Sequence, residues 1–255
     1  MDKDKIEYIQ SLSQKYENKD FIPKDPISFP HLFQGKKDIE IAAFVAQWLA
    51  YGKRELFLRV LDMLSIEMNL QPFDYIANRR FERWSSDNNC LYRFFKRKDF
   101  YSLCQSLYNI YIIRAKGEES FEDVIRENLN MSKNIDTLAV ITEIQKLFID
   151  VKGIPNNTKS SCKRLCMFLR WMVRTDSKVD FGIWHIVKPE QLIIPLDVHV
   201  FRQSRLLGLT SRNDTSMRTA IDITNSLKEI FPTDPTKADF ALFGLGVNGT
   251  DTSLD

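Results

Sequence analysis

The stretch Ile135–Val151, IDTLAVITEIQKLFIDV, carries the clearest helical pattern in the chain. Its apolar side chains recur every three or four positions, which is the spacing of one face of an α-helix. That face consists of Ile135, Leu138, Ile141, Ile144, Leu147 and Val151. A polar break, IPNNTKSS, follows at residues 154–161, and a second helical pattern, CKRLCMFLRWMVR, occupies Cys162–Arg174. We therefore expect a helix, a tight turn and a second helix across residues 135–174.

The second helix is expected to be amphipathic. Its apolar face contains Leu165, Cys166, Phe168, Leu169, Met172 and Val173. Its polar face is expected to carry Lys163, Arg164, Arg170 and Arg174.

The rest of the chain is also helical in pattern. The period predicts helices near residues 6–16, 38–51, 56–64, 100–111, 197–208, 220–231 and 235–245. The proline-rich segment FIPKDPISFPH at residues 21–31 is expected to be extended, because each proline disfavours helix in the residue before it. No segment alternates as a strand does. The sequence therefore predicts an all-α protein of about 9–12 helices.

Composition excludes several classes of protein. The chain has 255 residues and a net charge of +2, with no apolar run long enough for a membrane helix and no signal-peptide pattern at its charged N-terminus. Its four cysteines, at positions 90, 104, 162 and 166, match neither a disulfide scaffold nor a zinc site. We therefore expect no metal, and a cytoplasmic, reducing compartment.

The positive charge is concentrated in one segment. Residues 152–212 contain eleven Lys and Arg against four Asp and Glu, a local net charge of +7. Such a segment indicates contact with a polyanion, although 61 residues can also depart this far from neutrality by chance.

Lys163 is a candidate nucleophile because it falls in the first turn of the second helix. The positive end of a helix dipole repels a lysine there, and Arg164 adds to the repulsion, so the neutral amine is favoured. A neutral amine can form a Schiff base with a carbonyl carbon. The simpler alternative is a solvated lysine that binds a phosphate or nothing, and Lys159 could serve in its place.

Asp197 is a second candidate, in the segment PLDVHV at residues 195–200. An aspartate where an apolar stretch becomes a helix is first of all an N-cap. It could also stabilise positive charge or transfer a proton. His199, two residues further on, is expected to be structural or to contact a phosphate.

Together, CKRLCMFLRWMVR and IIPLDVHVFRQSRLLGL resemble the core of the helix-hairpin-helix DNA glycosylase superfamily, in its 8-oxoguanine glycosylase and lyase branches. The resemblance implies a two-subdomain helical fold within a single unit, residues 1–255. One subdomain would span residues 38–151, and the other residues 152–255 with the N-terminal helix 1–20. The chain also resembles an uncharacterised bacterial family, through DPISFPHLF, the AYGKR turn, KRLCMFLRWMVR and DFALFGLG.

The resemblance further implies a DNA-repair enzyme that removes a damaged base from duplex DNA and cleaves the strand. Lys163 would attack the sugar and Asp197 would stabilise its positive charge. Phosphates would be held by Lys159, Ser160, Arg164, His199, Arg202 and Arg205. The base pocket would draw on Gln47, Trp48, Trp171 and Phe240, although each aromatic residue also fits the core. No cofactor is implied, and no iron–sulfur cluster, because no cysteine follows Cys166.

Two other functions remain compatible with the sequence. One is a non-catalytic DNA- or RNA-binding protein, which the replacement of the usual Gly-rich hairpin by Gly153-Ile154-Pro155 favours. The other is an all-α interaction scaffold unrelated to DNA, in which Asp197 is only a cap. The insertion at residues 176–191, with Phe181, Ile183 and Trp184, could cover the pocket, pack on the core or contact a partner.

Overall fold

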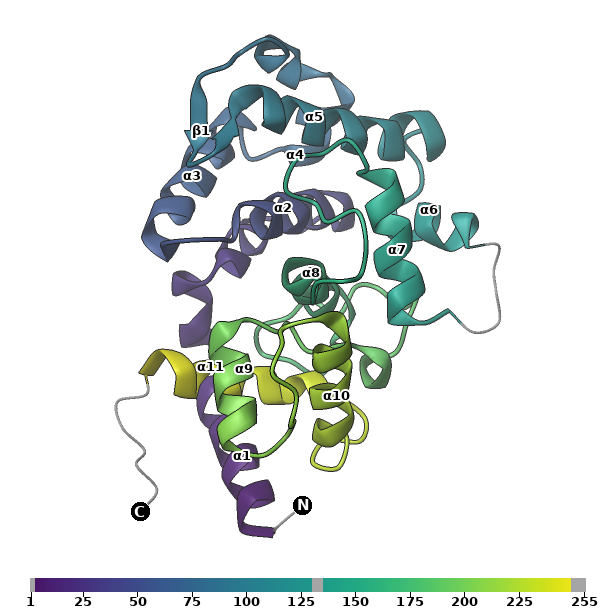
Figure 1. The fold of residues 1–255 in the computed structure, drawn as a ribbon. Coiled ribbons are helices and arrows are strands. Elements are labelled where there is room, and N and C mark those ends of the chain that lie inside the picture. The colour runs from purple at the N-terminus through teal and green to yellow at the C-terminus, as the bar shows by residue number, and fades with distance from the viewer. Residues whose placement is uncertain (1–2, 130–134, 249–255) are drawn as a thin grey trace. The chain divides into compact units, whose positions relative to one another are not determined.

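The computed structural model describes residues 3–129 and 135–248 and is mostly helical (Figure 1). The expectation of an all-α protein is confirmed at this level. The chain forms two compact units. Unit 1 comprises residues 1–21 and 158–255, and unit 2 comprises residues 22–157.

Unit 2 is a helical body with one small hairpin. Its α-helices are α2 (Lys36–Leu49), α3 (Arg54–Glu67), α4 (Pro72–Ala77), α5 (Arg97–Tyr108), α6 (Phe121–Asn128) and α7 (Thr137–Leu147). Short helical turns are η2 (Pro26–Ser28), η3 (Pro30–Leu32), η4 (Arg80–Trp84) and the π-helix η5 (Asn109–Arg114). Strands β1 (Cys90–Tyr92) and β2 (Phe95–Lys96) pair antiparallel, with Tyr92 opposite Phe95.

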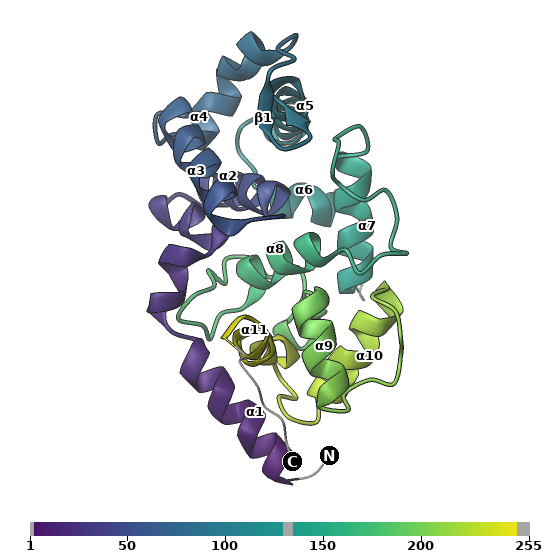
Figure 2. The ribbon, with the colours of Figure 1, turned by 60° about the vertical axis from the view of Figure 1, so that its left-hand side comes forward.

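Unit 1 is built from the two ends of the described chain. Its α-helices are α1 (Lys3–Tyr16), α8 (Lys163–Val173), α9 (Val198–Leu206), α10 (Met217–Leu227) and α11 (Ala238–Asn248), with 3-10 turns η6 (Pro189–Gln191) and η7 (Pro235–Lys237). Helix α11 packs on both α1 and α9 (Figure 2). These approaches are close, because a Cβ at Gly244 would lie 2.4 Å from the Tyr16 ring and one at Gly246 would lie 2.6 Å from the His199 Cβ.

The proline-rich segment is not extended, so that expectation was wrong. It forms η1 (Lys19–Lys24), which spans the boundary between the units, followed by η2 and η3. Asp25 does keep the extended backbone that a following proline favours, and its side chain caps η2. Phe29 instead adopts helical backbone angles before Pro30, where η3 begins. At this position the helical turn outweighs the preference of a residue before proline for extended backbone.

The expected tight turn between two helices is also wrong. Helix α7 ends at Leu147 and α8 begins at Lys163, and residues 148–162 between them are not helical. The two helices fall in different units. Phe148 and Val151 lie beyond the end of α7, in the turns that follow it, and their side chains are buried there. The apolar period of residues 135–151 therefore extends past the helix itself.

The insertion at residues 176–191 packs on the core. The backbone N–H groups of Phe181 and Trp184 donate to the carbonyl oxygens of Trp171 and Met172, both at 2.8 Å. Trp184 is fully buried, with its ring edge-on to Phe168 at 5.2 Å. Of the three roles open to this insertion, the structure shows the core-packing one.

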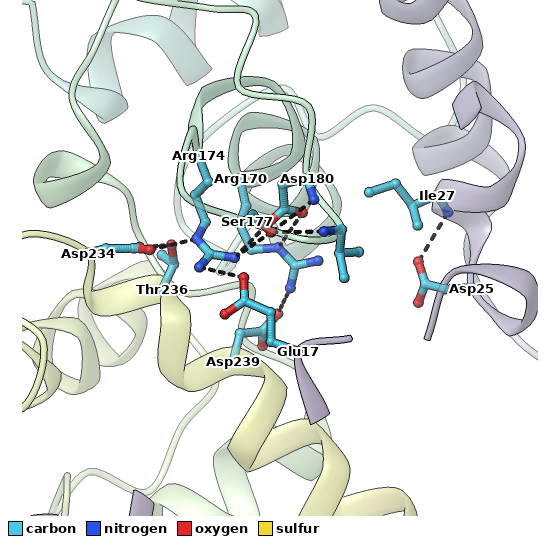
Figure 3. Close-up of polar contacts among 11 residues, drawn as sticks. Glu17, Asp25, Ile27, Arg170, Arg174, Ser177, Asp180, Asp234, Thr236 and Asp239 are labelled. Atoms are coloured by element: carbon cyan, nitrogen blue, oxygen red, sulfur yellow. Dashed lines mark hydrogen bonds and ion pairs between the residues drawn. The ribbon is translucent and has the colours of Figure 1, made fainter. Parts of the chain in front are cut away.

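Helix α8 is not amphipathic in the way the sequence suggested. Arg170 and Arg174 are 3% and 0% exposed, so they do not contribute to a polar face. Each is buried because carboxylates meet it, in what we call the arginine cluster: Arg170, Arg174, Glu17, Asp180, Asp234 and Asp239 (Figure 3).

The arginine cluster joins four parts of unit 1. Arg174 contacts Asp180 at 2.5 Å, Asp234 at 2.7 Å and Glu17 at 3.0 Å. Arg170 contacts Asp180 at 3.4 Å and pairs with Asp239 at the start of α11. Burial opposes the charged guanidinium, but the three carboxylates raise the pKa of Arg174 above its ordinary value. The cluster therefore ties α8 to the end of α1, to the loop after α8, to the residue that precedes η7 and to α11.

Arg174→Met tests the contribution of the cluster to stability. It leaves Glu17 and Asp234 without their cation and Asp180 with Arg170 alone, and we expect the free energy of unfolding to fall by about 3–5 kcal/mol. Urea unfolding at pH 7 measures the change. The matched control is Lys3→Met, which removes the exposed pair with Glu7 and should cost less than about 1 kcal/mol. Equal effects from the two substitutions would show that the cluster contributes no more than a surface pair.

Candidate functional site

Asp197 is the N-cap of α9, as its sequence context indicated. One carboxylate oxygen accepts hydrogen bonds from the backbone N–H groups of His199 and Val200, both at 2.9 Å. These bonds satisfy two N–H groups that have no partner within the helix. The carboxylate is thereby held in one orientation at the positive end of the α9 dipole.

Lys163 is the first residue of α8. Cys162 precedes it in the left-handed region, at φ 48°, and makes no side-chain cap bond. This turn redirects the chain into the helix. The Lys163 side chain is 32% exposed, so most of it is covered but it still reaches solvent.

The structure brings the two candidates together. The Lys163 Nζ lies 3.2 Å from the Asp197 Oδ2, and the Asp197 side chain is 17% exposed. The hydroxyl of Ser161 donates to the Leu196 carbonyl oxygen at 3.0 Å, which joins the segments that enter α8 and α9. The contact is an ion pair between the first residue of α8 and the N-cap of α9.

The start of a third helix adjoins this pair. Ser160 and Ser216 form an isolated antiparallel bridge, and the Met217 N–H donates to the Lys159 carbonyl oxygen at 3.4 Å. Ser216 is the N-cap of α10. The entry segments of α8, α9 and α10 are therefore joined through backbone and hydroxyl contacts around Lys163 and Asp197.

Asp239 is a buried carboxyl that interacts electrostatically with both members of the pair. Burial raises the pKa of Asp239 to about 6; Arg170 opposes this rise, Asp197 adds to it and Lys163 opposes it. The sequence analysis did not identify Asp239 as part of a site. Its position in DFALFGLG, next to two core residues, gave no sign of a partner on α8.

The expected phosphate-binding residues differ in their exposure to solvent. Lys159, Ser160, His199, Arg202 and Arg205 are exposed, and Arg164 is half-buried. Arg205 donates to the Arg212 carbonyl oxygen at 3.3 Å. Because Arg170 and Arg174 are enclosed by carboxylates, the +7 counted over residues 152–212 overstates the charge that a polyanion could meet.

The four residues expected to line a base pocket are buried, so that expectation is corrected. Gln47, Trp48 and Trp171 have no exposed surface, and Phe240 is 1% exposed. Trp48 donates to the Lys152 carbonyl oxygen at 2.8 Å and stacks on Phe95. The Phe240 ring packs under the Arg170 guanidinium at 4.6 Å. In this conformation these side chains serve as core, so none can stack on a base without a change in packing.

Two kinds of feature are absent from the described residues, 3–129 and 135–248. No group of three or more His, Cys, Asp or Glu among them could hold a metal ion. No helix in the same part of the chain combines the length and apolar character needed to cross a membrane.

Comparison with known proteins places most of the chain in one family. Residues 25–248 match a family described as "Protein of unknown function (DUF2400)". No curated protein and no solved structure matched the chain. The match agrees with the resemblance to an uncharacterised family, whereas the assignment to the helix-hairpin-helix glycosylase superfamily was wrong. That assignment depended on two short segments, and the family match that covers both of them is to a family of unknown function.

The titration of Asp239 predicts a pH dependence of stability. The folded protein holds the Asp239 proton up to pH about 6, whereas an unperturbed aspartate releases it near 3.8. Asp239 therefore contributes fully to stability below pH 3.8, and this contribution is lost as the pH rises to about 6. Between pH 4 and 7, wild type should lose stability relative to Asp239→Asn, which cannot ionise.

Urea unfolding of both proteins at pH 4, 5, 6 and 7 measures this difference, at about 1.4 kcal/mol per unit of pKa shift. A difference that stays constant with pH, or that moves in favour of wild type, would contradict the raised pKa of Asp239.

Proposed function

The chain belongs to the DUF2400 family of proteins of unknown function, and we propose that it is a DNA base-excision enzyme that removes a damaged base and cleaves the strand. In this proposal, Lys163 is the nucleophile and Asp197 is its charged partner. The observation that carries the proposal is the 3.2 Å contact between the Lys163 Nζ and the Asp197 Oδ2, at the surface and at two helix starts.

A lysine and a carboxylate in this arrangement can perform the chemistry of base excision. The Nζ, after losing one proton, would form a bond to C1′ of the deoxyribose while the bond from C1′ to the base breaks. The base would leave with the bonding electron pair and take up a proton. Opening of the sugar ring would then give an imine to Lys163, with the proton going to the ring oxygen.

The imine would allow cleavage of the strand. Loss of a proton from C2′ and departure of the 3′-phosphate complete a β-elimination, in which the imine accepts the electrons. Hydrolysis then releases the sugar and restores the amine. No metal or redox partner enters this sequence of steps.

Asp197 would stabilise the positive charge that develops on the sugar as the base departs. Its carboxylate is held by two backbone N–H groups, so it would not have to reorient during the reaction. The same carboxylate lies within reach of the Lys163 Nζ. It would accept one proton from the Nζ and pass it to the departing base, which returns Asp197 to its charged form.

The surroundings of the pair are suited to a polyanion. Exposed Lys159, Arg202 and Arg205 belong to the segments that enter α8 and form α9. Backbone N–H groups at helix starts add positive potential. Phosphate contacts of this kind position a substrate without specifying its sequence.

A second candidate is a nucleic-acid-binding protein without catalysis. Its supporting observation is the same contact. An ion pair between α8 and α9 would hold the two helix starts together even in a protein that has no catalytic activity. The two candidates differ in one result, which is covalent capture of the substrate.

Borohydride trapping distinguishes them. Wild type incubated with duplex DNA that contains an abasic site or 8-oxoguanine should give a covalent adduct after borohydride addition. Lys163→Gln should give none, whereas the neighbouring control Lys159→Gln should still give the adduct. Asp197→Asn, which keeps a side chain able to cap α9, should slow adduct formation about 100-fold or more.

The absence of an adduct with wild type, or an undiminished adduct with Lys163→Gln, would remove the enzymatic proposal. Salt-dependent duplex binding without an adduct would then support the non-catalytic candidate. A protein with no affinity for DNA at moderate salt would contradict both.

A further inference from the structure

The hairpin of unit 2 presents an aromatic ring to solvent. Its two-residue tip, Arg93 and Phe94, connects the opposed residues Tyr92 and Phe95. Phe94 is 57% exposed, and Arg93 is also exposed. More than half of this large apolar side chain therefore remains in contact with solvent.

The AYGKR turn, residues 50–54, supports this ring. The Tyr51 ring is stacked on Phe94, with centroids 4.8 Å apart and an angle of 26° between the planes. Tyr51 and Tyr92 also exchange hydrogen bonds, because each hydroxyl donates to the main-chain carbonyl oxygen of the other residue, at 3.3 and 2.6 Å. One side of the Phe94 ring is therefore held by a fixed partner while the side chain remains more than half exposed.

Cations surround the two rings. The Arg93 guanidinium lies 5.7 Å from the centre of the Tyr51 ring, and the Lys152 Nζ lies 5.5 Å from that of Phe94. Lys152 also donates to the Phe94 carbonyl oxygen and pairs with Asp99 at 3.3 Å. Gly52, at φ 79°, makes the approach possible, since a Cβ there would lie 2.1 Å from the Arg93 Nη1.

The local charge is positive on balance. Segments 50–54 and 90–98 contain six Lys and Arg and no Asp or Glu, while Asp87 and Asp99 nearby pair with Arg97 and Lys152. The basic segment identified from the sequence, residues 152–212, does not include them, so this concentration of charge comes from folding two separate stretches together.

We propose that Tyr51, Arg93, Phe94 and Lys152, which we name the hairpin platform, bind an unpaired base of a single nucleic-acid strand. The base would stack on Phe94, and the surrounding cations would meet the phosphates on either side of it. Aromatic rings interleaved with cations are the usual means of holding single strands, because every base has a face that can stack. Phosphates, rather than an apolar peptide, complement a surface with this charge.

The proposal goes beyond the chemistry assigned to Lys163 and does not depend on it. The hairpin platform lies wholly within unit 2, and the Lys163–Asp197 pair lies within unit 1. Failure of one proposal therefore leaves the other open to its own test.

The first test measures binding of the full chain to fluorescein-labelled dT12 by anisotropy at low salt. Phe94→Ala should weaken binding about 5-fold to 100-fold, the range expected for loss of one stacked base. Phe94→Trp, which keeps a stacking ring, should retain the affinity, and its fluorescence should change on addition of dT12. The matched control is Ile113→Ala, because Ile113 is 61% exposed in the same unit and lies outside the platform.

A parallel arm with rU12 establishes whether DNA or RNA supplies the preferred strand, and binding of either supports the proposal. The proposal is overturned if neither strand binds, if Phe94→Ala behaves like Ile113→Ala, or if a fully paired duplex binds with the same dependence on Phe94.

Discussion

The burial of Arg170 and Arg174 in α8 is the constraint on which unit 1 depends. A guanidinium cannot leave water unless carboxylates replace its hydration, so two buried arginines require several acidic side chains to arrive at one place. Glu17, Asp180, Asp234 and Asp239 come from four different parts of the chain. The ends of the chain are thus brought together by charge as well as by apolar packing (Figure 3).

The same constraint positions the candidate site. With α8 fixed through its middle and end, its first residue, Lys163, is fixed as well. The Ser161 hydroxyl then holds the segment that leads to Asp197, and α9 packs against α11 where Gly246 leaves room for the His199 Cβ. The geometry of the Lys163–Asp197 pair is therefore a consequence of packing more than one helix turn away from it.

The sequence predicted the helical class and the residue types of the site, but not their arrangement. Local signals were sufficient for Asp197 as a cap, because an N-cap depends on the next two or three residues. They were not sufficient for Arg170 and Arg174, which look like surface residues until their partners, up to 157 residues away for Glu17 and Arg174, are in place. The hairpin platform was missed for the same reason: the AYGKR turn and the basic hairpin are unremarkable separately and meet only in the fold.

Asp239 connects the arginine cluster to the proposed chemistry. In the proposed reaction Lys163 acts as a nucleophile 3.2 Å from the Asp197 carboxylate, so the negative charge that faces it matters. Because burial raises the pKa of Asp239 to about 6, protonation of that carboxyl below this pH removes one negative charge that interacts with Lys163. On the proposed function, the cluster that holds α8 in place therefore also changes, with pH, the negative charge that the nucleophile meets.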